Sequence, residues 1–399
     1  MIIGIERSRI EGEVKAPPSK SFAIRYVLLS LITDVKLESI PSSDDVTVAN
    51  KVVHDLKDGR DELFLGGSAT TLRMVIPILL ALGRKIKIDG DQTLRRRPLN
   101  SLRYLKGGKF TTLQPNANGS ISLPMVVEGK LEQETEIEGW ESSQYVSGLI
   151  YAYCILGYGR IKVIPPVSSK GYIHMTADVI NSVGGKVEIR DDVIEIKCSK
   201  LKKFHGSVPG DYALASFYAI GALITGGEIK ISSLYPPPSY FGDHEIVNMI
   251  KQTGAVSEVT GDSWFVKGSD VRRPLAVSIN DVPDLAPSLA GLMATIPGES
   301  KMLDSERLRI KESDRINTII STLRSFGIDA HYSSGTITIV GGEPKRGEIT
   351  CPNDHRIAML AGDLALRAGG IVKNAECVSK SNPNYWKDLA SLGARIREI

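Results

Sequence analysis

Six stretches of the chain place apolar side chains at intervals of three and four residues, the pattern of a helix with one buried face. The stretches read "SKSFAIRYVLLSLITD", "SATTLRMVIPILLALG", "SSQYVSGLIYAYCILG", "DYALASFYAIGALITGG", "PDLAPSLAGLMATIPG" and "NDHRIAMLAGDLALRAGG". They end near Asp34, Gly83, Gly157, Gly226, Gly298 and Gly369, so that successive ends lie 49, 74, 69, 72 and 71 residues apart. Four nearly equal intervals predict a repeated structural unit of about seventy residues.

Each stretch is followed by a second helical pattern that ends in glycine, which suits the left-handed position after a helix. These endings read "HDLKDG", "RYLKGG", "NSVGG", "IKQTG", "LRSFG" and "ASLG". Alternating apolar and polar residues after them, as in 186–197 and 328–340, predict paired strands. The order strand, helix, strand, helix, strand, strand would thus occur six times. It predicts an α/β protein of two similar three-unit domains, with "HGSVPGD" at 205–211 as the expected hinge.

Length and composition are those of a globular enzyme rather than a nucleic-acid or membrane protein. The 399 residues are too many for one typical core, and 42% apolar and 24% charged residues are ordinary values. A net charge of +3, without a basic tract among aromatics, argues against nucleic acid as a partner. The apolar run at 74–82 is too short to span a bilayer, and the first residues lack a signal-peptide core. We expect a cytoplasmic protein that does not bind membranes.

The cysteines and histidines do not suggest a metal site. Cys154, Cys198, Cys351 and Cys377 form no CxxC pair and no zinc-finger spacing, and the six histidines are scattered. In a cytosolic setting we expect the cysteines to be reduced and mostly structural. We also expect neither a metal ion nor a cofactor.

Small polar residues at the starts of the first helices suggest anion binding. Serine, aspartate and asparagine are ordinary helix caps, so each start taken alone has a structural explanation. A helix start also offers free N–H groups and a partial positive charge, which suit phosphate. Several such starts facing one cleft would form an anion-binding site.

Cationic residues accompany several of these starts. "PPSKSFAIR" at 17–25 puts Lys20 at a helix start and Ser21 and Arg25 on one helix face. "LRRRP" at 94–98 is either a solvated turn or a bidentate clamp for phosphate or carboxylate. "SSQ" at 142–144 offers more hydrogen-bonding groups than capping requires.

Two charged motifs lie in the last third of the chain. "RLRIKESDR" at 307–315 surrounds Glu312 and Asp314 with four cations, and it is either a solvated surface or a binding site. "NDHR" at 353–356 puts a cation on the first turn of a helix, where it opposes the helix dipole and therefore favours a bound anion. Lys380 follows in a loop that carries no signal of its own.

Together these motifs resemble those of one family, the 3-phosphoshikimate 1-carboxyvinyltransferases, also called EPSP synthases. The matching stretches are PSKSFAIR at 18–25, LGGSATTLR at 65–73, RRP at 96–98, SSQ at 142–144, SKGY at 169–172, the Asp284 segment, LRIKESDR at 308–315, NDHR at 353–356 and Lys380. They follow the family's order over nearly the whole chain, and LRxKESDR with NDHR is a specific combination.

The resemblance implies a fold and a reaction. The implied fold is a two-domain inside-out α/β barrel with three βαβαββ repeats per domain. Residues 20–208 would form one domain, residues 1–19 and 209–399 the other, with the active site in the cleft between them. The implied reaction joins phosphoenolpyruvate to the 5-hydroxyl of shikimate 3-phosphate and releases phosphate, in the shikimate pathway.

The resemblance also assigns roles to residues. Asp284 and Glu312 would be the acid–base carboxylates, with Lys20 competing for part of the proton transfer. The phosphoenolpyruvate site would consist of Lys20, Ala69, Arg97, Gln144, Arg315, Arg356 and Lys380. The shikimate 3-phosphate site would consist of Lys20, Ser21, Arg25, Ser142, Ser143, Gln144, Ser169, Tyr172, Asp284 and Lys311.

Two departures and three alternatives remain. Ala69 stands where the family usually has glycine, and Arg307 stands where many members have asparagine. A sister family transfers enolpyruvyl to a UDP-sugar, but its loop cysteine has no counterpart in 84–125. A non-catalytic anion-binding module would lack a carboxylate or lysine, and none is missing. RNA 3′-phosphate cyclases have a related fold, but no basic-aromatic surface is evident. We expect a monomer acting on small molecules.

Overall fold

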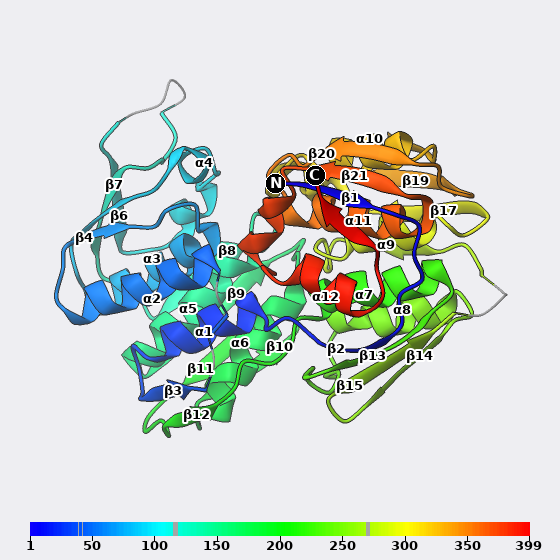
Figure 1. The fold of residues 1–399 in the computed structure, drawn as a ribbon. Coiled ribbons are helices and arrows are strands. Elements are labelled where there is room, and N and C mark those ends of the chain that lie inside the picture. Colours follow the sequence, from blue (N-terminus) through cyan, green and yellow to red (C-terminus); the bar gives the residue numbers. More distant parts are fainter. Residues whose placement is uncertain (39, 42, 115–118, 269–271) are drawn as a thin grey trace. The chain divides into compact units, whose positions relative to one another are not determined.

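The computed structural model describes residues 1–399 except 39, 42, 115–118 and 269–271 (Figure 1). The chain divides into unit 1, formed by Met1–Ser19 and Pro209–Ile399, and unit 2, formed by Lys20–Val208. Among the described helices, none combines the length and apolar character that crossing a membrane would require.

Unit 2 combines helices with three sheets. Its helices are α1 (Lys20–Leu29), α2 (Asp44–Lys57), α3 (Ala69–Leu82), α4 (Gln92–Arg95), the 3₁₀ helix η1 (Asn100–Tyr104), α5 (Ser143–Leu156) and α6 (Lys170–Ser182). Its strands are β3 (Val35–Leu37), β4 (Glu62–Phe64), β5 (Ile86–Asp89), β6 (Gly108–Thr112), β7 (Met125–Gly129), β8 (Glu134–Glu138), β9 (Tyr158–Ile164), β10 (Lys186–Arg190), β11 (Val193–Lys197) and β12 (Phe204–Gly206). The sheet orders are β4-β5-β7-β6, β10-β11-β9-β8 and β12-β3.

Unit 1 likewise combines helices with three sheets. Its helices are η2 (Asp243–Glu245), α7 (Tyr212–Thr225), α8 (Ile246–Gln252), α9 (Ala286–Met293), η3 (Glu306–Ile310), α10 (Arg315–Ser325), α11 (His355–Ala368), η4 (Ala375–Lys380) and α12 (Tyr385–Ser391). Its strands are β1 (Ile2–Ile5), β2 (Gly12–Lys15), β13 (Glu228–Ser232), β14 (Val256–Thr260), β15 (Ser263–Lys267), β16 (Ala276–Ser278), β17 (Gly298–Leu303), β18 (Asp329–Ser333), β19 (Thr336–Gly341), β20 (Gly347–Thr350), β21 (Gly370–Lys373) and β22 (Ile396–Glu398). The sheet orders are β14-β15-β13-β2, β16-β17-β19-β18 and β20-β21-β1-β22.

The repeated unit predicted from the spacing is present, with one shortened copy. Five of the described sheets contain one parallel pair of strands and two antiparallel pairings, as in β8-β9-β11-β10. The parallel strands are joined through a helix in four of these sheets, whereas β2 and β13 are separated along the chain by unit 2. The first copy instead has only the parallel pair of β3 with β12, and β4 of the next copy follows α2 in the described chain. The missing hairpin explains why the first sequence interval is only 49 residues.

The predicted helices are confirmed with one exception. All six long apolar stretches form α-helices, and five of the second patterns do as well. The exception is "RYLKGG", where the structure has the short 3₁₀ helix η1 after the four-residue α4. Proline at position 98 accounts for this interruption, because proline lacks an N–H and disfavours helix at the preceding residue.

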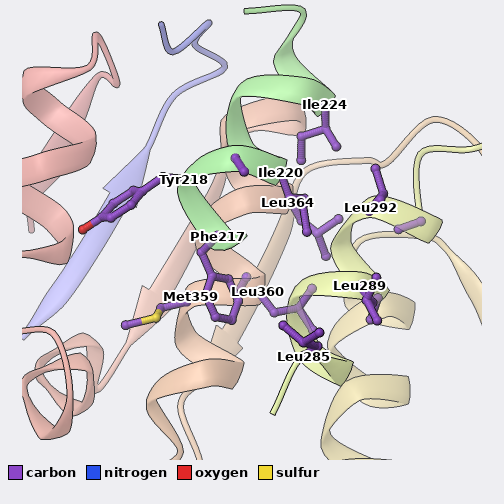
Figure 2. Close-up of a cluster of buried hydrophobic side chains, with 14 of the residues drawn as sticks. Phe217, Tyr218, Ile220, Ile224, Leu285, Leu289, Leu292, Met359, Leu360 and Leu364 are labelled. Atoms are coloured by element: carbon purple, nitrogen blue, oxygen red, sulfur yellow. The ribbon is translucent and has the colours of Figure 1, made fainter. Parts of the chain in front are cut away.

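The core of unit 1 lies where its three long helices meet. Helices α7, α9 and α11 pack against one another, and their apolar side chains are almost completely buried. Figure 2 shows the facing side chains of α7 (Phe217, Ile220 and Ile224), α9 (Leu289 and Leu292) and α11 (Met359, Leu360 and Leu364). In unit 1, the helices thus lie at the centre and the sheets lie outside them. The polar residues at the helix starts are not needed for packing this core.

Candidate active site

In unit 1, three cations converge on the carboxylate of Asp284. Asp284 lies in the turn just before α9, and 24% of its side chain is exposed. Its Oδ1 accepts hydrogen bonds from Arg315 Nη1 at 2.9 Å and Lys311 Nζ at 3.3 Å, and its Oδ2 accepts from Arg356 Nη2 at 3.3 Å. The structure thus brings together four residues that the sequence singled out from three separate segments.

Arg315 links this carboxylate to two others. Its side chain is fully buried at the start of α10, where Asp314 is the N-cap. Arg315 Nη2 donates to Glu312 Oε2 at 2.7 Å, and Arg315 Nε donates to Asp354 Oδ2 at 2.9 Å. Burial of a guanidinium is tolerable when such charged partners surround it. The "RLRIKESDR" segment is therefore built around a buried ion network, while its Arg309 pairs with Asp314 near the surface.

Asp354 and Lys380 connect the "NDHR" segment to this network. The buried Asp354 carboxylate caps α11 by accepting from the backbone N–H of Arg356 at 3.2 Å, and it also accepts from Ser313 Oγ at 3.0 Å. Lys380, at the end of η4, donates through Nζ to the backbone carbonyl of Asn353 at 2.8 Å. The two segments that carry Arg356 and Lys380 therefore meet directly.

The network controls the ionisation of its members. Burial opposes ionisation of Asp284, but the three surrounding cations outweigh that cost and hold its pKa well below the ordinary value. Burial likewise opposes ionisation of Asp354, yet Arg315 keeps its pKa lowered. Burial lowers the pKa of the Lys311 ammonium despite the attraction of Asp284. The carboxylates are therefore ionised at neutral pH, and Lys311 releases its proton more readily than an exposed lysine.

In unit 2, the side chain of Arg25 ties three helices together. Arg25 is 1% exposed on α1. Its Nε donates to Thr176 Oγ1 at 2.8 Å, and its Nη2 donates to the carbonyl of Tyr172 at 2.9 Å and to Ser147 Oγ at 3.3 Å. Its Nη1 donates to the carbonyl of Ser21 at 2.8 Å. These oxygens are neutral, and the four hydrogen bonds orient the guanidinium.

Lys20 opens α1 beside an acidic residue. Its Nζ donates to Asp45 Oδ2 at 2.7 Å, and both side chains are 24% exposed. Asp45 lies in the first turn of α2, where Ser43 is the N-cap. Partial exposure leaves the ammonium accessible to a ligand.

A second hydrogen-bonded group joins the starts of α3 and α5. Gln144 Oε1 accepts from Arg73 Nη1 at 3.1 Å, and Gln144 Nε2 donates to Thr70 Oγ1 at 2.8 Å. Arg73 Nη2 also donates to the carbonyl of Pro98 at 3.3 Å, which places the "LRRRP" segment beside this group. Ala69 is the half-buried first residue of α3, next to Thr70.

The remaining predicted residues of unit 2 occupy helix starts and loops. Ser142 is the N-cap of α5 and accepts from the N–H of Gln144, and Ser143 is buried beside it. Ser169 precedes α6 in a left-handed conformation with φ of 56°, and Tyr172 lies in the first turn of α6. The side chain of Ser169 makes no capping hydrogen bond to α6, so helix capping does not explain why a serine stands at this position.

The three arginines of "LRRRP" have different environments. Arg95 pairs with Asp89 through two hydrogen bonds of 3.0 and 2.6 Å, which gives it a structural role. Arg96 is exposed and Arg97 is half-buried next to Pro98. Arg97 is thus the arginine that directly precedes Pro98, whose carbonyl oxygen accepts a hydrogen bond from Arg73.

Sequence reasoning missed two residues of these groups and misjudged the cysteines. The sequence motifs give neither Asp354 nor Arg73 a role of its own. A charged residue inside the apolar run of α3 could have signalled a buried polar partner.

The expectation of reduced cysteines is wrong, because the structure contains Cys154–Cys198 and Cys351–Cys377 disulfides. Partners 44 and 26 residues apart are brought together by the tertiary fold, which spacing rules do not capture. In the described part of the chain, no group of three or more His, Cys, Asp or Glu side chains could hold a metal ion.

Two solved structures have the same fold as this chain. An EPSP synthase from Acinetobacter baumannii matches over 100% of both chains with a TM-score of 0.79 and 22% sequence identity. The enolpyruvyl transferase NikO from Streptomyces tendae matches over 99% of this chain and 98% of its own, with a TM-score of 0.77 and 15% identity. The fold is that of the enolpyruvyl transferases, which confirms the predicted two-domain α/β architecture.

Sequence relatives define the family. The EPSP synthase (3-phosphoshikimate 1-carboxyvinyltransferase) family model matches residues 56–389. Relatives named 3-phosphoshikimate 1-carboxyvinyltransferase are 47% identical in Sulfurisphaera tokodaii and 46% identical in Saccharolobus solfataricus, with 99% of each chain covered. A third, from Caldivirga maquilingensis, is 37% identical over the same share. The chain belongs to the EPSP synthase family, a family of transferases.

Proposed function

We propose that the protein transfers the enolpyruvyl group of phosphoenolpyruvate to the 5-hydroxyl of shikimate 3-phosphate. The hydroxyl oxygen bonds to the enol carbon and loses its proton, while the methylene carbon gains a proton. The resulting tetrahedral intermediate then releases phosphate as its C–O bond breaks and its methyl group gives up a proton. The reaction thus needs anion-binding groups, one base and one acid.

The two groups in unit 2 supply anion binding in this proposal. Arg25 and Arg73 are more than nine-tenths buried, and they donate hydrogen bonds to the neutral oxygens of Thr176 and Gln144, respectively. A preorganised guanidinium of this kind binds phosphate or carboxylate with little loss of side-chain entropy. We assign Ser21, Arg25, Ser142, Ser143, Gln144, Ser169 and Tyr172 to shikimate 3-phosphate, and Lys20, Ala69, Arg97 and Gln144 to phosphoenolpyruvate. Lys20 also adjoins shikimate 3-phosphate.

The network in unit 1 supplies the acid and base. Asp284 takes the hydroxyl proton in this scheme, and Glu312 in its protonated form gives its proton to the methylene carbon, with Lys20 as an alternative for one transfer. A carboxylate with a strongly lowered pKa is a weak base in the free protein. Substrate anions that approach Lys311, Arg315, Arg356 and Lys380 would neutralise these cations and so raise the basicity of Asp284. Substrate binding would therefore make the Asp284 carboxylate a stronger base.

The observation that carries the proposal is the convergence of Lys311, Arg315 and Arg356 on one carboxylate in a member of this family. The test is phosphate release from phosphoenolpyruvate by the purified protein, with shikimate 3-phosphate or UDP-N-acetylglucosamine as acceptor. We expect release only with shikimate 3-phosphate, and the same rate after chelation of metals. Release with the UDP-sugar alone, or release that requires a divalent ion, would contradict the proposal.

We further propose that the protein works as a cytoplasmic monomer and that both units act on the same substrates. All the assigned ligands come from one chain, so the scheme needs no partner, nucleic acid or membrane. Disulfides do not exclude this location, because intracellular proteins of hyperthermophiles contain them. Light scattering of the purified protein, with an expected mass near 43.3 kDa, tests the oligomeric state.

A further inference from the structure

The Cys351–Cys377 disulfide joins two segments that carry candidate ligands. Cys351 directly follows β20 and lies two residues before Asn353. Cys377 lies in η4, three residues before Lys380. Both cysteines are buried, at 3% and 7% exposure. The cross-link therefore fixes the start of the "NDHR" segment to the helical turn that ends in Lys380.

These segments also meet through the candidate ligands themselves. Lys380 Nζ donates to the carbonyl of Asn353 at 2.8 Å, and Cys351 Sγ lies 3.4 Å from the carbonyl oxygen of Asp354. The backbone N–H of Cys351 donates to the carbonyl of Lys373, which anchors the same segment to the end of β21. The disulfide, the Lys380 hydrogen bond and the Cys351 backbone hydrogen bond thus connect the Cys351–Asp354 segment with η4 and with the end of β21.

The local backbone would otherwise have freedom to move. Asn353 adopts a left-handed conformation with φ of 64°, which L-residues other than glycine adopt at some cost. Lys380 has a flexible four-carbon side chain at the end of a single 3₁₀ helix. A shift of Asn353 would move the carbonyl oxygen that accepts the hydrogen bond from Lys380 Nζ. Small displacements of this kind weaken substrate positioning strongly.

We propose that the Cys351–Cys377 disulfide is a positioning cross-link that holds Arg356 and Lys380 in place for phosphoenolpyruvate. This inference rests on the proposed function. Opening the bond with a dithiol reductant breaks one S–S bond and gives two thiols. The dithiol supplies two electrons and two protons and becomes a cyclic disulfide. The opened form then binds phosphoenolpyruvate more weakly while the acid–base residues stay in place.

The second disulfide provides the matched control. Cys154 lies near the end of α5, at the opposite end of that helix from Ser142 and Gln144. The Cys154→Ala/Cys198→Ala variant retains only the proposed cross-link, and the Cys351→Ala/Cys377→Ala variant retains only the control disulfide. Each is assayed oxidised, after dithiothreitol, and after reoxidation, with thiols counted by alkylation and mass spectrometry. Reduction then opens one chosen bond in each protein.

We expect reduction of Cys154→Ala/Cys198→Ala to raise the KM for phosphoenolpyruvate at least fivefold and to change kcat less than threefold, with recovery on reoxidation. The Cys351→Ala/Cys377→Ala variant should show the raised KM before reduction and no further change after it. Four free thiols in the untreated wild-type protein would overturn the proposal. So would an unchanged KM after complete reduction, or an equal effect of opening either bond. Activity of the oxidised wild type in the same assay tests the proposed function separately.

Discussion

The two units hold their buried cations in different ways. In unit 1, Arg315 donates hydrogen bonds to three carboxyl groups, those of Asp284, Glu312 and Asp354. In unit 2, Arg25 and Arg73 donate to hydroxyl, amide and carbonyl oxygens. A network of carboxyl groups and cations can control protonation, whereas hydrogen bonds to neutral oxygens orient a guanidinium. We therefore expect proton transfer in unit 1 and anion binding mainly in unit 2.

The strongest test of this division is removal of a carboxylate from unit 1. Glu312→Gln keeps the size and the hydrogen-bonding capacity of the side chain but removes a proton-transfer group. We expect kcat to fall roughly 10²-fold or more, with little change in the KM for shikimate 3-phosphate. Steady-state kinetics measures both constants. Glu306→Gln, at an exposed position in η3, is the matched control and should change kcat less than twofold.

A result in which kcat of Glu312→Gln stayed within a few-fold of wild type would break the comparison. Glu312 would then serve only to neutralise Arg315. A large rise in KM at constant kcat in Glu312→Gln would also contradict the division of roles between the units. Unit 1 would then act in binding rather than in proton transfer.

A second test concerns stability and pH. Asp354→Asn leaves Arg315 without one of its buried carboxylates, and breaking such a pair costs about 3–5 kcal/mol at neutral pH. Because the folded-state pKa of Asp354 is lowered, its contribution is present above its unfolded pKa of about 3.9 and is lost as the pH falls through the folded pKa. Urea unfolding at pH 7 and at pH 3 should therefore show a difference from wild type that shrinks in acid.

The control for this variant is Asp314→Asn. Asp314 caps α10 and is 35% exposed, and asparagine is also a good cap, so stability should change little at either pH. A loss for Asp354→Asn that did not depend on pH would mean that Asp354 acts through its shape and capping rather than through its charge.

A smaller effect separates the neighbouring arginines of unit 2. Arg97→Ala removes a candidate phosphoenolpyruvate ligand, and we expect its KM to rise about tenfold, or roughly 1.4 kcal/mol of binding, with kcat nearly unchanged. Arg95→Ala removes the partner of Asp89 and should change this KM less than twofold. Equal effects of the two variants would show that the segment acts through general charge and not through a specific ligand.

Much of the fold could be predicted from periodicity because the helices bury one face. The apolar stripes of α7 and α11 marked them as core helices, and glycine marked the end of each. The shortened first copy appeared in the sequence as an irregular interval, but its cause lies in the pairing of β3 with β12, more than 160 residues apart. Strand pairing over such distances leaves no local pattern.

The candidate site could be predicted in its residue types but not in its connections. The charges of "RLRIKESDR" stood out, yet their partners Asp284 and Asp354 lie 31 and 39 residues from Arg315. Capping propensity explained Asp354 adequately, so its second role as an ion partner stayed hidden. Arg73 was read as part of an apolar helix, because only the folded structure shows that Gln144 and Pro98 receive its hydrogen bonds.

The smallest effect tests Ala69, whose methyl group is the departure from the usual glycine. Ala69 begins α3 next to Thr70, which holds the amide of Gln144. Glyphosate, which inhibits many members of this family by occupying the phosphoenolpyruvate site, is longer than phosphoenolpyruvate. One additional methyl group in the wall of that site should therefore exclude glyphosate preferentially, at a cost of about 1–3 kcal/mol. We expect Ala69→Gly to lower the Ki for glyphosate about fivefold or more relative to the KM for phosphoenolpyruvate, with kcat unchanged.

The control for Ala69→Gly is Ala81→Gly, near the other end of α3. Both changes replace alanine by glycine within one helix, and glycine in a helix costs up to about 1 kcal/mol of stability. A general loosening of α3 would therefore shift the Ki to KM ratio in both variants, whereas a local methyl effect shifts it only in Ala69→Gly. An unchanged ratio in Ala69→Gly would place the methyl group outside the phosphoenolpyruvate site. A fall in kcat instead of a change in the ratio would mean that the start of α3 takes part in the chemical step, which would weaken the division of roles between the two units.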